Sequence, residues 1–423
     1  MKILWLVNQP LPAISCAEEI PVRVTEGWLV GLSQVLVNRR VDLVICFPQN
    51  YRKEMLIGQT DGYEYYGFYK KNIYATSPSQ ETEKKLEWIL QREKPDVIHL
   101  MGTEFSHSYE MVETCRRLNL RNRVIVSIQG ITSCYAKVYM GGLPKKIYSR
   151  KTLRDILLRD SLQDQKKKME TRGRLETKLL AEVSHVIGRT DWDYQEVKKI
   201  NPQIRYYKNN ENLREIFYRE RWSYEGCEPY RIFMGQITYP IKGFHFILEA
   251  FSEIKNHFPQ AKLYVAGKNI RKKAAWRRTY YQRYLLHRIA ELGLEDDIVF
   301  LGELSAEKMC EQYLKANVFV LPSIIENSSN ALGEAMLLGT PCVAAETGGT
   351  PSMLRGDEEG FLYPVKRVDL LTEDIECLFL DPELADQFSQ AAREHAKETH
   401  DREKNCDTLM GIYDMVAGGE ENA

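Results

Sequence analysis

Several common features are missing from this 423-residue sequence, and each absence excludes a class of protein. No stretch approaches the roughly 18 consecutive apolar residues that cross a bilayer, so we expect no membrane-spanning helix. The nine cysteines are scattered and form no Cys-x-x-Cys pair, which favours reduced thiols over a disulfide framework or a zinc site. The net charge is only -1, so no overall attraction to nucleic acid or to a membrane is expected.

The N-terminal apolar run is also too short for a secretion signal. It covers only Ile3 to Val7 before Asn8, Gln9 and Pro10 interrupt it. A first buried parallel strand is therefore the better interpretation. Together with the reduced thiols, this predicts a cytoplasmic protein.

Short apolar runs alternate with longer segments of helical periodicity along the whole chain. The first half contains the runs ILWLV, VDLVICF, DVIHL and RVIVSI, and the second half restarts with YRIFMG, KLYVAG, IVFLGEL and NVFVLPS. This alternation predicts parallel strands joined by crossover helices. Because 423 residues are too many for one ordinary core, we expect two doubly wound, Rossmann-like α/β domains in tandem.

The boundary between the two domains is predicted within residues 201–226, where NPQ and NNEN interrupt the periodicity. We therefore assign residues 1–205 to an N-terminal domain and residues 206–400 to a C-terminal domain. Residues 401–423 are predicted to be helical, and a return of this helix to the N-terminal domain is one option.

Two glutamates follow the apolar run NVFVLPS, Glu326 in a polar loop and Glu334 in the next predicted helix. The loop would lie at the carboxyl edge of the second sheet, where open α/β folds bind ligands. Ser328 or Ser329 is a suitable N-cap, and the helix amides that follow would favour a phosphate or diphosphate.

Carboxylates do not bind phosphate, but they accept hydrogen bonds from hydroxyl groups. The pair of glutamates therefore predicts a ligand with sugar hydroxyls on both sides of a phosphate, which describes a nucleotide sugar. For two isolated glutamates the alternative is a solvated loop residue and an exposed helix residue.

The neighbouring segment ALGEAMLLGTPCVAAETGGTP resembles the signature of the retaining glycosyltransferases of group 1, also called family 4. The resemblance implies the GT-B fold, with two Rossmann-like domains facing a central cleft. It implies that Glu326 contacts the donor sugar and that Glu334 contacts the ribose. No cofactor is implied besides the nucleotide sugar itself, which is a co-substrate.

A second segment, YRIFMGQITYPIKGFHFILEAF, is similar to the family's Gly-Arg-x4-Lys-Gly motif, whose two cations neutralise the donor diphosphate. Lys242 matches the lysine, whereas Gln236 stands in place of the arginine and removes a fixed charge. VAGKN, FLGEL and TGGTP also fit family loops around the base and phosphates. The donor-binding residues implied by the resemblance are Gly27, Gln236, Lys242, Gly267, Lys268, Leu301, Glu326, Asn327, Ser328, Ser329, Asn330, Leu332 and Glu334.

The N-terminal domain binds the acceptor in this family. The segment VTEGWLVGL keeps Gly27 of the family's glycine pair and has Glu26 in the other position. Gln129 stands where the family commonly has a histidine, and its amide offers a carbonyl to the acceptor but takes no proton. His99 ends a comparable strand, so it is either an acceptor-side residue or a hydrogen-bonded core histidine.

The resemblance implies a transfer at one face of the sugar, in which the leaving diphosphate receives the acceptor proton. Catalysis would then depend on Glu326, Lys242 and Gln129 through positioning and charge stabilisation. No strong general base is required.

The segment RTDWDY contains an Asp-x-Asp, which binds a metal in glycosyltransferases of the other major fold. Here the pattern of that fold is missing, so Asp191 and Asp193 are interpreted as loop or helix-start residues, and we expect no metal. Arg189 is predicted to contact the acceptor or the other domain.

Two segments concentrate positive charge. Residues 145–178 hold 12 Lys/Arg and 5 Asp/Glu, with Leu153, Ile156 and Leu157 on one helical face. This pattern fits either a basic amphipathic element on an anionic membrane or a solvated face whose apolar stripe packs on its own domain. Residues 268–288 contain no acid and mix Arg and Lys with aromatic residues, which we expect to border the nucleotide or membrane phosphates rather than nucleic acid.

These patterns predict a metal-independent retaining glycosyltransferase that uses a nucleoside diphosphate sugar, most often UDP-linked in such families. The acceptor would be a polysaccharide or lipid-linked glycan, reached from the cytoplasm or the inner face of the cell membrane during envelope synthesis. The substitutions at Gln236 and Gln129 leave a rival, a pseudo-enzyme that acts as a binding or scaffold subunit. An epimerase with the same fold is a third option.

Overall fold

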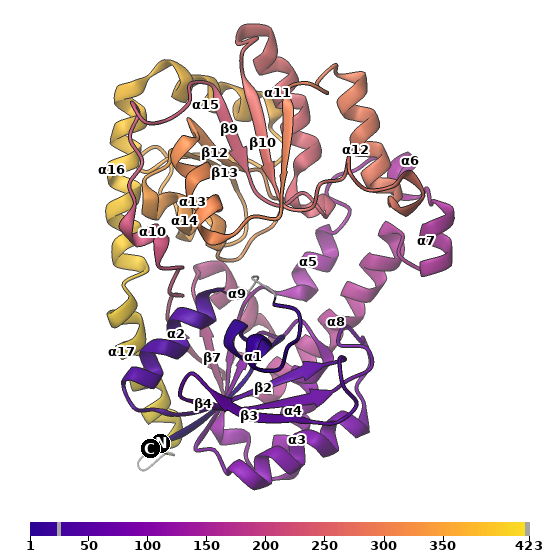
Figure 1. The fold of residues 1–423 in the computed structure, drawn as a ribbon, viewed down its shortest axis with the longest axis vertical. Coiled ribbons are helices and arrows are strands. Elements are labelled where there is room, and N and C mark those ends of the chain that lie inside the picture. The colour runs from indigo at the N-terminus through magenta and orange to yellow at the C-terminus, as the bar shows by residue number, and fades with distance from the viewer. Residues whose placement is uncertain (23–26, 419–423) are drawn as a thin grey trace. The chain divides into compact units, whose positions relative to one another are not determined.

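The computed structural model describes residues 1–22 and 27–418 and divides the chain into two compact units (Figure 1). Unit 1 comprises Met1–Cys134, Met169–Leu213 and His400–Ala423, and unit 2 comprises Tyr135–Lys168 and Arg214–Thr399. Each unit is a largely parallel sheet with helices on it, as the alternation of apolar runs and helical periodicity predicts.

Unit 1 contains an eight-stranded sheet in the order β3-β4-β2-β1-β5-β6-β7-β8, in which only the edge pair β3 and β4 is antiparallel. All four apolar runs predicted as strands in the first half are strands of this sheet. The strands are β1 (Lys2–Leu6), β2 (Asp42–Gln49), β3 (Leu56–Thr60), β4 (Tyr63–Tyr69), β5 (Val97–Met101), β6 (Val124–Ser127), β7 (His185–Gly188) and β8 (Arg205–Lys208).

Helices cover both faces of this sheet, because successive side chains of a buried strand point to opposite faces. Along β1, Ile3 and Trp5 belong to one apolar cluster, while Leu4 and Leu6 belong to the other. The helices are α1 (Pro12–Ala17), α2 (Gly27–Asn38), α3 (Gln80–Glu93), α4 (Ser106–Arg117), the 3-10 helix η1 (Arg121–Arg123), α9 (Asp191–Ile200) and α17 (Arg402–Ala417).

The C-terminal helix α17 is tied to the sheet of unit 1 by one buried tyrosine. Tyr413 Oη accepts a hydrogen bond from Trp5 Nε1 at 2.9 Å and lies 2.7 Å from His99 Nδ1. Trp5, on β1, and His99, on β5, are both buried. This helix therefore supplies part of the core at the centre of the sheet.

Unit 2 contains a six-stranded, fully parallel sheet in the order β11-β10-β9-β12-β13-β14. Its strands are β9 (Arg231–Met234), β10 (Lys262–Ala266), β11 (Ile298–Gly302), β12 (Val318–Leu321), β13 (Cys342–Glu346) and β14 (Phe361–Pro364). Its main helices are α10 (Ile216–Arg219), η2 (Pro240–Lys242), α11 (Phe244–His257), η3 (Ala275–Arg277), α12 (Tyr280–Glu291), α13 (Ala306–Lys315), α14 (Asn330–Leu338), η4 (Thr350–Ser352), α15 (Val368–Leu380) and α16 (Pro382–Thr399).

Residues 135–168 belong to unit 2, although the sequence analysis placed all of 1–205 in one N-terminal domain. The helices α5 (Thr132–Val138) and α8 (Leu162–Glu182) carry the chain out of unit 1 and back, and α6 (Lys145–Tyr148) and α7 (Leu153–Leu158) lie between them. His245 Nε2 lies 2.8 Å from the carbonyl oxygen of Gly141, and α6 packs on α12. Helical periodicity carries no information about which domain a segment contacts, which explains the difference.

Across residues 1–22 and 27–418, every helix is too short or too polar to cross a membrane.

Candidate active site

Three loops of unit 2 meet at Glu326. Gly243, at the end of η2, has φ +71°, and a Cβ there would lie 1.7 Å from the carbonyl oxygen of Pro322. Gly348, in the loop after β13, has φ +52°, and a Cβ there would lie 2.0 Å from the carbonyl oxygen of Glu326. At both positions glycine allows a left-handed backbone conformation and a close approach between two loops, which the Cβ of any other residue would prevent.

Backbone hydrogen bonds join the same loops. The Ile324 amide donates to the Ile241 carbonyl at 2.8 Å, and the Gly349 amide donates to the Glu326 carbonyl at 3.0 Å. Thr347 Oγ1 donates to the Ile324 carbonyl at 2.7 Å. The segment between β12 and α14 is thereby held from both sides.

Glu326 and Lys242, both predicted as catalytic residues, form an ion pair at this junction. Lys242 Nζ lies 2.5 Å from Glu326 Oε1, and Ser323 Oγ donates to the same oxygen at 2.7 Å. The Glu326 side chain is 9% exposed and that of Lys242 is 28% exposed, so the pair is partly screened from water. A buried carboxylate is stable here because a cation and a hydroxyl group both satisfy it.

Helix α14 begins where the sequence analysis predicted. Ser329 is its N-cap and accepts a hydrogen bond from the Leu332 amide at 3.4 Å. Asn330 is the first helical residue, and Ser328 and Asn327 precede it in the loop after Glu326. These residues lie at the carboxyl end of β12, as expected for the predicted ligand site.

Glu334, on α14, is buried and has a partner that the sequence analysis missed. Arg214 Nε donates to Glu334 Oε1 and Arg214 Nη2 donates to Glu334 Oε2, both at 2.8 Å. Burial raises the pKa of Glu334 to about 7, and the positive charge of Arg214 opposes that shift. The two-point contact fixes the plane of the carboxyl group.

The other predicted donor residues lie at neighbouring strand ends of unit 2. Gln236 is exposed after β9, and its Nε2 donates to Thr238 Oγ1 at 3.1 Å. Gly267 follows β10 with φ +96°, and a Cβ there would lie 3.6 Å from Gln236 Cα. Lys268 is the next residue and is exposed, and Leu301 lies in β11. Lys268 therefore places a positive charge one position after Gly267, the glycine that approaches Gln236.

In unit 1, two predicted acceptor-side residues meet at a buried glutamate. Arg189 Nη1 lies 2.7 Å from Glu211 Oε1, and Gln129 Nε2 donates to the same oxygen at 2.9 Å. Arg189 Nη2 also donates to the Ile128 carbonyl at 2.6 Å. Glu211, which lies in the polar run NNEN that was interpreted as a linker, was not predicted.

His99 is a core histidine. Both ring nitrogens are bonded, Nδ1 to Tyr413 Oη and Nε2 to Ser127 Oγ, each at 2.7 Å. Burial lowers its pKa to about 3, so the ring is neutral. Of the two readings of the sequence, the structure supports the hydrogen-bonded core residue.

A cavity of unit 1 lies at the carboxyl ends of β5, β6 and β7, between α2, α17 and residues 209–212. His99, Arg189 and Glu211 line it, together with other side chains of these strands, helices and residues 209–212. Two buried acceptor atoms, Asn209 Oδ1 and Glu211 Oε2, receive no hydrogen bond from any residue in the described part of the chain. Such atoms call for hydroxyl or amine donors.

Asp191 and Asp193 begin α9, as predicted for the Asp-x-Asp. Thr190 is the N-cap and forms a capping box with Asp193, whose carboxylate also receives the Arg189 amide at 3.0 Å. Within the ranges that the structure describes, no three His, Cys, Asp or Glu side chains are grouped to hold a metal ion. Gly27 is the first residue of α2, while Glu26 lies outside the described residues.

Residues 215–395 match the family model described as glycosyl transferases group 1. The D-inositol 3-phosphate glycosyltransferase of Saccharomonospora viridis is 32% identical over 131 residues, which cover 31% of this chain and 30% of that protein. The chain matches only 25% to 49% of the length of the first curated relatives.

Solved structures match nearly the whole chain. Sucrose-phosphate synthase from Thermosynechococcus elongatus superposes with a TM-score of 0.72 at 16% identity, covering 99% of this chain and 100% of that one. HepE of Anabaena in complex with UDP and glucose gives a TM-score of 0.68 at 14% identity, covering 97% and 99%.

The two α/β units, each built on a largely parallel sheet, match the GT-B fold of these solved structures. The predicted fold class is thereby confirmed. Over residues 215–395, the chain is similar to the group 1 glycosyl transferases.

Proposed function

We propose that the protein is a retaining, metal-independent glycosyltransferase that moves a sugar from a UDP-linked donor to a glycan or lipid-linked acceptor. One observation carries the proposal: Lys242 and Glu326 lie 2.5 Å apart at the carboxyl end of the second sheet, beside the start of α14. A cation for phosphate, a carboxylate for hydroxyl groups and helix amides then lie within one site.

In this proposal each residue of unit 2 has a separate task. Lys242 and the first amides of α14 stabilise the charge that develops on the departing diphosphate. Glu326 accepts hydrogen bonds from the sugar, and Glu334, held by Arg214, accepts them from the ribose. Lys268, next to Gly267, supplies part of the charge that Gln236 lacks.

The acceptor is proposed to bind to unit 1. Glu211 Oε2 and Asn209 Oδ1 are buried oxygen atoms that can accept hydrogen bonds. They suit a glycosyl acceptor that donates hydrogen bonds from its hydroxyl groups. Arg189 and Gln129 hold Glu211 in place, so Gln129 acts through positioning rather than by taking a proton. The proton of the acceptor would pass to the leaving diphosphate.

The structure of HepE, which contains UDP and glucose, supports the choice of a UDP-linked donor. All nine cysteines of the chain are free thiols, which supports a cytoplasmic location. We propose a role in polysaccharide or envelope synthesis on the basis of the acceptor class.

Calorimetric titration with UDP, GDP and ADP tests the proposal. We expect micromolar binding of UDP, weakened roughly 10-fold to 100-fold in Lys242→Met, because a charge-assisted hydrogen bond contributes about 1.5–3 kcal/mol. Lys397→Met is a matched control, since Lys397 is an exposed lysine on α16 of the same unit.

Binding of UDP that Lys242→Met leaves unchanged would contradict the proposed donor site. Absence of binding for all three nucleotides would favour the rival, a pseudo-enzyme that acts as a binding subunit.

A further inference from the structure

Helix α7 presents a row of apolar side chains to solvent. Leu153 is 80% exposed, Ile156 58%, Leu157 81% and Leu158 61%. The amphipathic stripe predicted from the sequence therefore does not pack on its own domain. Four large aliphatic side chains exposed on one short helix are unusual for a protein surface and indicate an interaction site.

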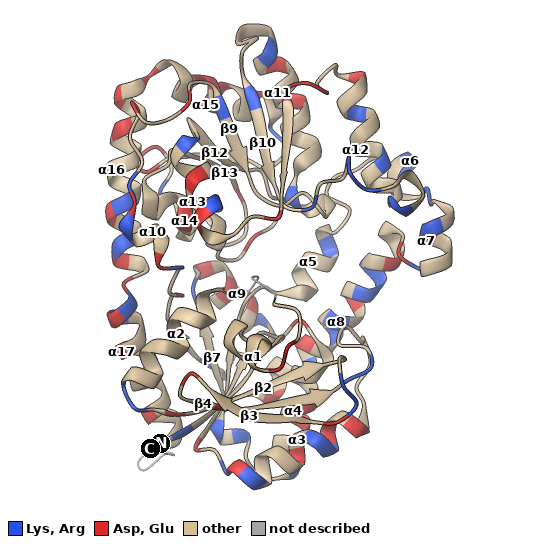
Figure 2. Ribbon diagram, in the orientation of Figure 1, with Lys and Arg blue, Asp and Glu red and all other residues tan. Residues whose placement is uncertain are grey.

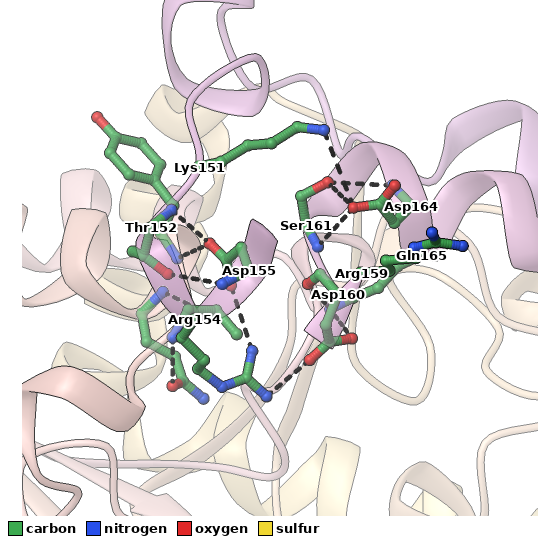
Figure 3. A network of polar contacts seen from close by, with 12 residues as sticks. Lys151, Thr152, Arg154, Asp155, Arg159, Asp160, Ser161, Asp164 and Gln165 are labelled. Carbon is green, nitrogen blue, oxygen red and sulfur yellow. Dashed lines mark hydrogen bonds and ion pairs between the residues drawn. The ribbon is translucent and has the colours of Figure 1, made fainter. Parts of the chain in front are cut away.

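Polar contacts hold this helix firmly (Figure 3). Thr152 forms a capping box with Asp155, and Asp155 Oδ2 also accepts the amide of Tyr280, the first residue of α12, at 3.0 Å. Arg154, within the helix, also donates from Nη2 to Oδ2 of Asp160, which follows the helix, at 2.7 Å. The outward direction of the apolar side chains is thus built into the fold of unit 2.

A second apolar group lies beside α7, from a part of the chain more than a hundred residues away. The 3-10 helix η3 packs on α7, and its Trp276 is 68% exposed. The guanidinium carbon of Arg277 lies 4.6 Å from the centre of the Trp276 ring. We call α7, η3 and the basic residues of 145–159 and 268–283 the α7–η3 surface.

Lys and Arg predominate on this surface, where they lie along α6, α7 and the segment before α12 (Figure 2). Residues 145–159 and 268–283 contain 13 Lys/Arg and a single acid, Asp155. Asp155 is buried in the cap of α7, so its carboxylate does not reach the surface. The two basic segments that the sequence analysis treated separately therefore form one positive surface.

We propose that the α7–η3 surface docks on a bilayer that contains anionic phospholipids. Its leucines and Trp276 would enter the interface, and the surrounding Lys and Arg would contact lipid phosphates. Tryptophan favours the membrane–water interface, because one part of its ring is apolar and its N–H is polar. A predominantly positive rim complements an anionic lipid surface better than a protein surface, which mixes both signs.

Only part of the basic segment 145–178 would contact the membrane. The docking residues are those of α7 and of η3, whereas α8 from Met169 onward belongs to unit 1. Docking requires no nucleotide, so it stands independently of the proposed transferase activity.

Flotation of the full chain with lipid vesicles tests the proposal. We expect binding to vesicles of phosphatidylcholine with 30 mol% phosphatidylglycerol, weakened by salt, and little binding to pure phosphatidylcholine at about 0.1 M salt. Leu153→Ser combined with Leu157→Ser should lower the partition coefficient roughly tenfold or more. Arg277→Glu should lower it by a similar factor, on the order of tenfold.

Matched controls separate docking from general effects of polarity and charge. Leu380→Ser removes a leucine that is 69% exposed elsewhere in unit 2, and Lys397→Glu reverses an exposed charge on α16. Both should bind vesicles like the wild-type chain. UDP titration and thermal melting of every variant confirm that the site and the fold are intact.

Three outcomes would overturn the proposal. The first is absence of binding to anionic vesicles, and the second is equal binding by the leucine double variant and the wild-type chain. The third is a wild-type chain that ignores vesicles but self-associates in light scattering, with the leucine variant monomeric. That result would assign the surface to a second copy of this chain.

Discussion

The close approach of Gly243 to Pro322 makes Gly243→Ala a sharp test of how the donor site is built. Gly243 has φ +71°, which costs a non-glycine residue about 1–2 kcal/mol. Its Cβ would also lie 1.7 Å from the Pro322 carbonyl oxygen and 2.6 Å from the Pro322 carbonyl carbon. Both are backbone atoms, so no flexible side chain can move aside.

The magnitude follows from these distances. A normal contact of about 3.4 Å requires the two loops to separate by more than 1 Å, and such overpacking costs about 1–3 kcal/mol. The total destabilisation should be about 2–5 kcal/mol, or roughly 5–15 °C in melting temperature for a unit of this size. Because Lys242 precedes the glycine, the separation should also break its 2.5 Å contact with Glu326 and weaken UDP binding.

Gly293→Ala is the matched control. Gly293 has φ +66° in the same unit, but a Cβ there would meet no atom within 4 Å. It should therefore show only the backbone cost of about 1–2 kcal/mol, with UDP affinity unchanged. Equal melting temperatures and equal UDP affinities for the two variants, measured by scanning calorimetry and titration, would refute the reasoning.

Three further predictions concern single contacts. Arg214→Gln removes the charge that opposes protonation of Glu334, so the pKa of Glu334 should rise above 7. UDP affinity should then fall about tenfold at pH 7.5, as titration would show. Tyr413→Phe leaves the Trp5 N–H unpaired and should cost about 1–3 kcal/mol in denaturant unfolding, whereas an unchanged midpoint would contradict the role of this contact. His99 has a pKa of about 3 when folded, so the unfolded chain binds more protons between about pH 3 and 6.5 and stability falls as pH decreases through that range. In His99→Gln the loss of stability between pH 7 and 5.5 should be smaller by about 1.4 kcal/mol, and equal slopes for both chains would be inconsistent with a neutral buried ring.

Much of the fold could be predicted because buried parallel strands are continuous apolar runs. All eight runs named from the sequence are strands of the two sheets. The hairpin of β3 and β4 was missed, although Asp61 and Gly62, both with positive φ, mark its turn. The edge strand β3 alternates in burial and β4 is rich in tyrosine, so neither has the continuous aliphatic run that marked the eight predicted strands.

The sequence predicted the proximity of Lys242 and Glu326 only through a resemblance, whereas the helix start at Ser329 followed from local capping chemistry. Arg214 and Glu211 were missed because both lie in the segment between the sheets, where the periodicity is weak. One signal could have indicated Arg214. It follows the polar run NNEN and directly precedes residue 215, where the family match begins.

The sequence by itself determined the alternation of strands and helices, the loop that carries Glu326 and the helix that carries Glu334. These features depend on residues within about ten positions of one another, so periodicity and capping reveal them. Only the tertiary structure decided that Arg214 holds Glu334, 120 residues away, and that α7 and η3 form one positive, apolar surface. Such contacts depend on how the intervening chain folds back, and no local pattern records that path.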